Sequence, residues 1–150
     1  MIRLQWIPTD KKRFLPLLLL ADEQENMIDR YLMRGTLFAA MDGAQLAGVA
    51  VVTKESAGIF ELKNLAVVPQ RQGQGIGQEI VRLLCERYRA QGGGILRVGT
   101  GESPKTLGFY RACGFKECGR VVDFFTAHYD PPIVEDGITL KDMIYLEKEL

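Results

Sequence analysis

The chain has 150 residues, of which 47% are hydrophobic, and its 19 basic and 19 acidic residues give a formal net charge of zero. This length and composition predict one folded domain, residues 1–150, with a core of ordinary size. Because no block of one charge sign is present, the sequence argues against a nucleic-acid partner. Three cysteines without CxxC spacing and a single histidine do not match a structural zinc site, so we expect no metal and a reducing, cytoplasmic location.

An apolar run, FLPLLLL, follows three basic residues near the N-terminus. A secretory signal has a similar start, but this run carries Pro16, continues into acidic residues and lacks a small-residue cleavage site. It is also too short to cross a bilayer. We therefore expect the buried face of a first helix, and no membrane partner.

The spacing of apolar residues predicts a mixed α/β fold around one largely antiparallel sheet. Glycine and proline mark most element boundaries, and the turn at Asp42-Gly43 is typical of a hairpin. The elements expected in chain order are an edge strand at 1–7, helices at 11–20 and 23–33, strands within 36–54 and 59–68, a helix from 76 to the glycines at 92–94, a strand at 95–100, a helix at 103–113, and two long final strands joined at 128–137.

The segment QRQGQGIG, residues 70–77, places three glycines at alternate positions before a helix. It does not match a dinucleotide-binding fingerprint, because Gln78 stands where the third glycine is required, and it lacks the lysine of a P-loop. A loop without side-chain bulk before a helix nevertheless leaves backbone N–H groups free, and the helix dipole favours an anion there. The segment is therefore a candidate pyrophosphate site, although the glycines are equally compatible with a tight turn and close helix packing.

Two motifs in the middle of the chain, about 48–118, resemble those of the GNAT-type N-acetyltransferases. Gln72 followed by Gly75 and Gly77 is similar to the acyl-CoA-binding motif of that family, and LGFYRACGF, residues 107–115, is similar to its second motif. The resemblance implies a single-domain fold whose mostly antiparallel sheet splays into a V between about four helices. It also implies acetyl-CoA as a cosubstrate and no metal. The cofactor-binding residues that it implies are Leu65, Ala66, Val67, Gln72, Gly73, Gln74, Gly75, Ile76, Gly77, Gln78, Ser103 and Tyr110.

One departure from the family pattern concerns the segment before the second motif. Many members have an asparagine there that contacts pantetheine, whereas this chain reads TGESP. Ser103 is the residue that would substitute for it, and the same residue is the expected cap of the helix at 103–113.

The resemblance also implies roles for two catalytic residues. An alkyl ammonium has a pKa of about 10.4, so some base or water chain must take a proton from the amine. Glu61 is similar to the strand carboxylate that family members use, directly or through water, and we expect it on the same face as Lys63 and Leu65. A solvated strand-end charge is the alternative. Tyr110 resembles the tyrosine that acts as an acid toward the CoA sulfur, with Phe109 turned into the core; core packing is the alternative for Tyr110.

The connection at 128–137 is the expected wall of the acceptor site. Its two prolines stiffen it, and its three acidic residues stand without lysine or arginine, so it would attract a cationic amine. We predict that Tyr129 and Glu135 line this site, the alternative being a solvated acidic hairpin tip. His128 is assigned to a surface turn and Cys113 to packing, and neither receives a catalytic role.

The sequence therefore predicts an N-acetyltransferase that transfers the acetyl group of acetyl-CoA directly to a primary amine of a small molecule or peptide. A domain that binds or senses acyl-CoA without transferring the acyl group is the alternative. A nucleotide-binding regulatory module is disfavoured, because neither an acidic ribose partner nor a P-loop lysine is present. The sequence leaves open the identity of the acceptor and whether the chain forms a homodimer.

Overall fold

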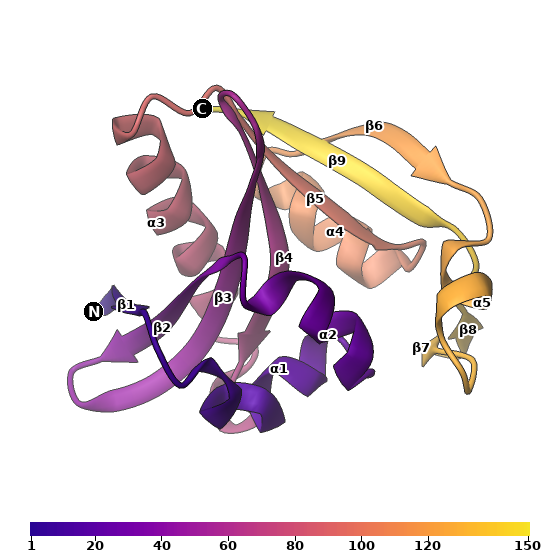
Figure 1. Ribbon diagram of the computed structural model, residues 1–150, viewed down its shortest axis with the longest axis horizontal. Helices are drawn as coiled ribbons and strands as arrows, with labels where there is room; N and C mark the ends of the chain where they lie inside the picture. Colours follow the sequence, from indigo (N-terminus) through magenta and orange to yellow (C-terminus); the bar gives the residue numbers. More distant parts are fainter.

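A seven-stranded sheet, in the strand order β1-β2-β3-β4-β5-β9-β6, forms the centre of the computed structural model (Figure 1). The structure describes residues 1–150. Neighbouring strands are antiparallel except β4 and β5, which are parallel. The strands of this sheet are β1 (Ile2–Ile7), β2 (Thr36–Asp42), β3 (Gln45–Ser56), β4 (Ile59–Val67), β5 (Ile95–Gly101), β6 (Lys116–Val121) and β9 (Met143–Glu149).

Each face of the sheet carries a different pair of helices (Figure 1). Helices α3 (Ile76–Ala90) and α4 (Pro104–Ala112) cover one face, where Ile80 and Leu84 of the predicted apolar stripe are fully buried. Helices α1 (Leu15–Ala21) and α2 (Glu25–Leu32) cover the other face, through Leu18 and Ile28. The predicted mixed α/β fold is confirmed.

The sheet opens between β4 and β5, and this opening positions the site (Figure 1). The two strands pair only from Ile59 with Ile95 to Leu62 with Val98. Beyond that point β4 continues beside β3, whereas β5 continues beside β9. The edge of β4 that follows Leu62 therefore has no strand partner on the β5 side, as expected for a sheet splayed into a V.

A bulge in β4 changes which layer its side chains face. The pairing with β3 shifts between Leu62 and Asn64, so Lys63 is an extra residue in this strand. Leu62 and Leu65 consequently both contact the core on the α3 side, whereas alternation along the strand places Glu61 on the opposite face. The expectation that Glu61 and Leu65 share a face is wrong, because the bulge reverses the alternation between them.

The first predicted helix is broken into two pieces. A 3-10 helix at Lys11–Phe14 precedes α1, which begins at Leu15. Pro16 lies in the first turn of α1, where its missing N–H is tolerated, and inside one continuous helix it would have removed a hydrogen bond.

The segment between β6 and β9 is longer and more structured than expected. It contains α5 (Phe124–His128) and a separate hairpin of β7 (Val134–Glu135) and β8 (Ile138–Thr139). After β6, Asp123 adopts the left-handed conformation (φ 56°), which changes the direction of the chain before α5. The burial of Phe125 holds α5 against the rest of the protein. The predicted long final strands are wrong in this respect, and His128 ends a helix instead of lying in a turn.

Candidate active site

A cavity of about 580 Å³, here called the cofactor groove, follows the free edge of β4. The loop before α3 and the facing side of α4 complete its walls. The sequence-predicted cofactor residues that line this groove are Leu65, Ala66, Val67, Gln72, Gly73, Gly77 and Tyr110. The structure therefore brings residues from three separate elements to one groove, as the two sequence motifs indicated.

The loop at the start of α3 presents a run of free backbone donors. Arg71 and Gln72 donate their amides within the preceding 3-10 turn, and the first helical bond runs from the Glu79 amide to the Gly75 carbonyl. Between them, the amides of residues 73–78 donate to no protein acceptor. Free N–H groups at a helix N-terminus are a suitable arrangement for phosphate oxygens, so these residues fit the pyrophosphate of a CoA molecule. Gln74, Gly75, Ile76 and Gln78 do not line the groove, and their free amides are what they could contribute to such a site.

Glycine is required in this loop for two different reasons. Gly73 and Gly75 have backbone φ angles of 77° and 81°, which residues other than glycine rarely adopt. A Cβ at either position would point into open space. Gly77 lies inside the helix, where a Cβ would approach the ring of Phe109 to 3.2 Å. The first two glycines thus shape the loop, while Gly77 allows α3 to pack against α4.

Tyr110 lines the cofactor groove and is also one of the buried residues of the core. Its ring packs edge-on against Phe109 and Phe115, and its hydroxyl makes no hydrogen bond within the protein. Burial raises the pKa of Tyr110, and the neighbouring Cys113 and Glu135 raise it further. Phe109 is less buried than Tyr110 and lines the same groove, so the expected division, with Phe109 in the core and Tyr110 at the cofactor, is only half correct.

Ser103 stands outside the groove. It is fully buried immediately before α4, where its Oγ neither caps the helix nor finds another hydrogen-bond partner. A contact between Ser103 and pantetheine would therefore require the side chain to become accessible first.

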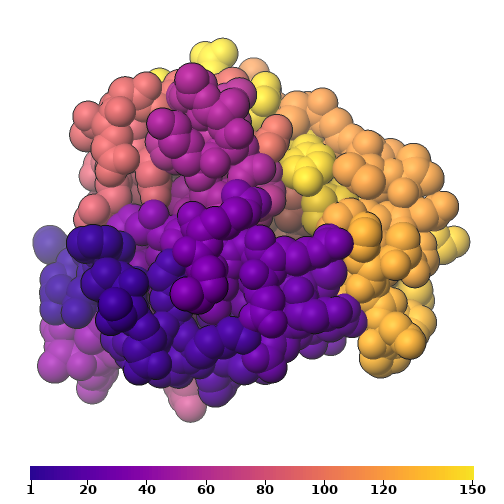
Figure 2. Space-filling view, viewed as in Figure 1, coloured from indigo at the N-terminus to yellow at the C-terminus, as the bar shows by residue number.

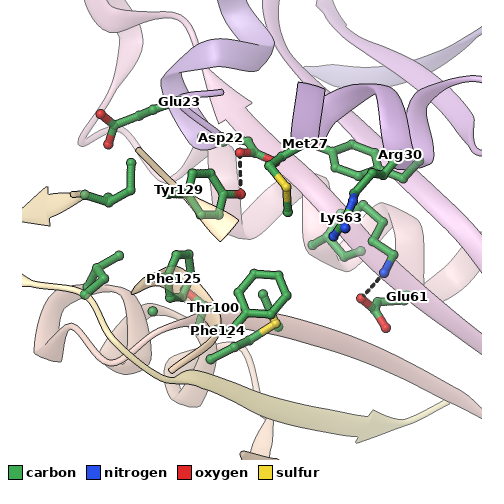
Figure 3. Close-up of a pocket in the computed structure, with 18 of the residues that line it drawn as sticks. Asp22, Glu23, Met27, Arg30, Glu61, Lys63, Thr100, Phe124, Phe125 and Tyr129 are labelled. Carbon is green, nitrogen blue, oxygen red and sulfur yellow. Dashed lines mark hydrogen bonds and ion pairs between the residues drawn. The ribbon is translucent and has the colours of Figure 1, made fainter. Parts of the chain in front are cut away.

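A second cavity, of about 290 Å³, lies beside the cofactor groove on the α2 side and is here called the acceptor cavity (Figure 3). Its walls come from the α1–α2 connection, α2, the middle of the sheet and the α5–β8 segment. The aromatic side chains that line it are those of Tyr31, Phe124, Phe125, Tyr129 and Tyr145. The residues that line both cavities, and so mark where they join, are Leu20, Ala21, Leu62, Lys63, Gly99, Thr100 and Glu135.

Glu61 lies in the wall of the acceptor cavity, where Figure 3 shows its ion pair with Lys63. It is only 3% exposed, its Oε2 lies 2.5 Å from Nζ of Lys63, and its Oε1 accepts a 2.9 Å hydrogen bond from Arg97. The expected pairing with Lys63 is present, but Glu61 is buried and is not a solvated strand-end charge. Glu61 and Lys63 stand two positions apart on β4, and their ion pair places both side chains on the same side of the sheet.

A hydrogen-bond network links the two sides of the acceptor cavity at Tyr129 (Figure 3). The Tyr129 hydroxyl donates to Oδ1 of Asp22 at 2.7 Å, and the Tyr31 hydroxyl donates to Oδ2 of the same carboxylate at 3.0 Å. Burial raises the pKa of Asp22, although both hydroxyl bonds oppose the rise, and burial beside Asp22 raises the pKa of Tyr129. Tyr129 therefore lines this cavity and joins its two sides. Its partner Asp22 could not be identified from the sequence, which shows no motif around it.

The charged side chains of the acceptor cavity are of both signs. Glu135 lines both cavities and accepts a weak 3.4 Å hydrogen bond from Thr106. Asp136, the next residue, lines the cofactor groove alone. Arg30 also lines the acceptor cavity without an ion-pair partner, so the site is less uniformly acidic than the 128–137 connection suggested.

Comparison with known proteins identifies the class to which this fold and groove belong. The family model described as Acetyltransferase (GNAT) domain matches residues 18–147. A Bacillus subtilis (strain 168) protein, "Uncharacterized N-acetyltransferase YvbK", is 38% identical over 135 residues, which cover 89% of this chain and 87% of that protein. The chain therefore belongs to the GNAT acetyltransferase family and is an N-acetyltransferase by homology.

Two solved structures agree with this assignment over their whole length. The IAA acetyltransferase from Bacillus cereus ATCC 14579 superimposes with a TM-score of 0.91 at 37% identity, covering 100% of both chains. A GNAT family acetyltransferase from Elizabethkingia anophelis with acetyl-CoA bound superimposes with a TM-score of 0.93 at 33% identity, covering 99% of this chain and 98% of that one. Acetyl-CoA is thus bound by a close structural relative. None of the helices in the present chain has the length and apolar character needed to cross a membrane.

Proposed function

We propose that the chain transfers the acetyl group of acetyl-CoA directly to a primary amine held in the acceptor cavity. The observation that carries this proposal is the junction of the two cavities at Leu62, Lys63, Gly99 and Thr100, where β4 and β5 stop pairing. An acceptor amine at this junction would lie beside the end of a pantetheine arm in the groove. Such proximity is a requirement of a direct transfer.

The cofactor groove supplies the binding contacts. Acetyl-CoA provides an activated thioester carbonyl when it is bound. The amides of residues 73–78 are assigned to its pyrophosphate, and the free backbone edge of Leu65, Ala66 and Val67 is assigned to the pantetheine amides. The first assignment uses amide donors that the protein itself leaves unpaired; on the β4 edge, the Val67 carbonyl already accepts a hydrogen bond from the Gln72 side chain.

Tyr110 is assigned to the sulfur. A thiol has an ordinary pKa of about 8.5, and the raised pKa of Tyr110 makes its hydroxyl a weaker acid than the thiol that leaves. Complete proton transfer from Tyr110 is therefore uphill. We assign to its hydroxyl, which has no partner in the protein, a hydrogen bond that stabilises negative charge on the sulfur.

Glu61 is assigned to removing a proton from the acceptor ammonium, directly or through a water molecule. Its place in the wall of the acceptor cavity supports this role. Each of its oxygens already faces one cation, so only the remaining lone pairs are available to a proton or to water. The structural interpretation, in which Glu61 only joins Lys63 to Arg97, remains the competing one and is tested below.

The acceptor is proposed to be a cationic amine. Glu135 at the junction and Asp22 in the opposite wall are carboxylates that would attract an ammonium group, and the aromatic side chains that line the cavity add a surface suited to a cation or an apolar body. We also infer a cytoplasmic location, which the three free thiols of the chain support.

The test is a panel of polyamines, amino acids, aminoglycosides, peptides and lysine derivatives, scored by release of free CoA and by the mass of the acetylated product. Amine-dependent release of CoA is the expected result. Binding of acetyl-CoA by calorimetry without release for any amine would instead establish a domain that binds acyl-CoA without transferring the acyl group.

A further inference from the structure

Two segments on opposite sides of the acceptor cavity are tied together by hydrogen bonds, and we call this contact the clasp. The Tyr129 hydroxyl donates to Asp22 at 2.7 Å. The side-chain amide of Gln24 donates to the His128 carbonyl at 3.0 Å, and its oxygen accepts from the Asp130 amide at 3.1 Å. The clasp thus joins the α1–α2 connection to the end of α5. Figure 2 shows the purple surface of α1 and α2 meeting the orange surface of α5.

The clasp is anchored in the core. Asp22 also accepts a hydrogen bond from Tyr31, whose hydroxyl oxygen accepts one from the side-chain amide of Asn64 at 3.1 Å. Asn64 and Tyr31 are 3% and 6% exposed, and the Asn64 amide bonds the Leu18 carbonyl as well. Bonds between such buried groups are costly to break, because a buried polar group that loses a partner cannot replace it with water. One side of the clasp is therefore rigid.

The clasp separates two hollows. Asp22 and Tyr129 line the acceptor cavity on its inner side (Figure 3). Gln24, His128 and Asp130 line a shallow hollow on the outer surface, and Tyr129 lines both. The wall between the acceptor cavity and this outer hollow is therefore about one side chain thick. Without the clasp, the cavity and the hollow would form one continuous groove.

This arrangement bears on the size of the acceptor and rests on the proposed function. The cavity of about 290 Å³, which opens into the cofactor groove, lies near the lower limit of ligand pockets, roughly 300–1,000 Å³. A peptide acceptor must lead its chain out of the cavity at about 3.3–3.6 Å per residue, which requires an exit in line with its backbone. Gln24 and Tyr129 line the outer hollow, so a chain that left the cavity on that side would have to pass the clasp.

We propose that the clasp restricts the enzyme to small free amines and excludes amines carried by peptides and folded proteins. Asp22, Gln24 and Tyr129 are then specificity residues, because the hydrogen bonds of the clasp exclude longer acceptors. Tyr129 also lines the cavity and so contacts the small amines. The sequence is compatible with a small-molecule acceptor or a peptide acceptor, and the clasp selects the small molecule.

The test compares lysinamide with a hexapeptide amide that begins with lysine, since both present the same cationic amines. We expect the wild-type kcat/KM for lysinamide to exceed that for the hexapeptide by roughly tenfold or more, a factor typical of steric discrimination. The double variant Gln24→Ala and Tyr129→Phe removes all three bonds of the clasp but keeps the aromatic ring. This variant should reduce the preference for lysinamide at least about fivefold, because the peptide gains an exit.

The outcomes separate this proposal from the proposed function. A wild-type enzyme that acetylates the hexapeptide as fast as lysinamide overturns the proposal. An unchanged preference in the double variant also overturns it, provided that thermal unfolding and acetyl-CoA affinity show an intact fold; the single variant Gln24→Ala serves if the double variant fails to fold. A protein that binds acetyl-CoA but acetylates no amine at all rejects the proposed function, and the proposal with it.

Discussion

Leu62 pairs with Val98, and this is the last residue pair that joins β4 to β5. One residue further along β4, the bulge at Lys63 begins, and the cofactor groove and the acceptor cavity meet at the same level. The sheet therefore opens at the same place in the chain at which the side-chain alternation of β4 reverses. Together the opening and the reversal create both the free backbone edge for a pantetheine arm and the space beside it for an amine.

The first prediction concerns the loop glycines. Gly75→Val should weaken CoA binding roughly tenfold or more, equivalent to about 1.4 kcal/mol per factor of ten, because a branched side chain at φ 81° shifts the amides of the loop. Gly92→Val is the matched control, since Gly92 also has a φ of 81° and open space around its Cβ but lies at the far end of α3. Calorimetry should show weaker CoA binding only for the Gly75 variant, and equal affinities would place the pyrophosphate elsewhere.

A second prediction concerns the Tyr110 hydroxyl. Tyr110→Phe keeps the buried ring and should lower kcat by roughly 10- to 1,000-fold, the range of a lost charge-stabilising donor. Tyr88→Phe removes another largely buried hydroxyl, from the opposite end of the core, and should leave kcat within about twofold while lowering the melting temperature. Single-turnover rates are the measurement, and an unchanged rate in the Tyr110 variant removes this residue from the mechanism.

The pH dependence of kcat gives a third prediction. Burial raises the pKa of Tyr110 above the ordinary value of about 10, so its protonated, hydrogen-bond-donating form persists as the pH rises through that value. We therefore expect no loss of kcat from ionisation of Tyr110 up to about pH 10. If kcat of the wild type fell below about pH 10 and kcat of Tyr110→Phe did not, Tyr110 would ionise in that range. That result would contradict a pKa raised by burial.

The sequence motifs predicted the local parts of the site, because those parts depend on neighbouring residues. Gln72, Gly75 and Gly77 lie close together in the sequence. The amphipathic helix that begins beside them indicates where the backbone amides point. Contacts between distant segments carry no such signal: Asp22 and Tyr129 are 107 positions apart, and Arg97 and Glu61 are 36 apart. The first pair depends on α5 and the second on the parallel register that sets Glu61 beside Arg97, and neither feature has a sequence pattern strong enough to predict.

A fourth prediction separates the two interpretations of Glu61. Glu61→Gln keeps the shape of the side chain, and if Glu61 takes the proton of the acceptor it should lower kcat/KM for the amine by roughly 100-fold. Glu55→Gln is the control, because Glu55 also pairs with Arg97, at 3.9 Å, but lines neither cavity. Both variants weaken the charge network, so equal losses of melting temperature and of kcat/KM in the two would assign Glu61 a structural role.

The fifth prediction concerns Glu135 and its neighbour. Glu135→Gln should raise the KM for a cationic amine several-fold, roughly 1 kcal/mol, because it removes the carboxylate at the junction of the cavities. Asp136→Asn removes the same charge one residue away but outside the acceptor cavity, so the KM for the amine should not change. Steady-state kinetics at saturating acetyl-CoA give both values, and a best acceptor that is neutral or anionic would refute the acidic-wall account.

The most direct measurement is a crystal structure of this chain with CoA and the best amine of the panel. The account predicts a pantetheine arm paired with the backbone of residues 65–67, its sulfur within hydrogen-bond distance of the Tyr110 hydroxyl, and the amine nitrogen between Leu62 and Thr100. A sulfur remote from Tyr110, or an amine bound outside the acceptor cavity, would contradict it.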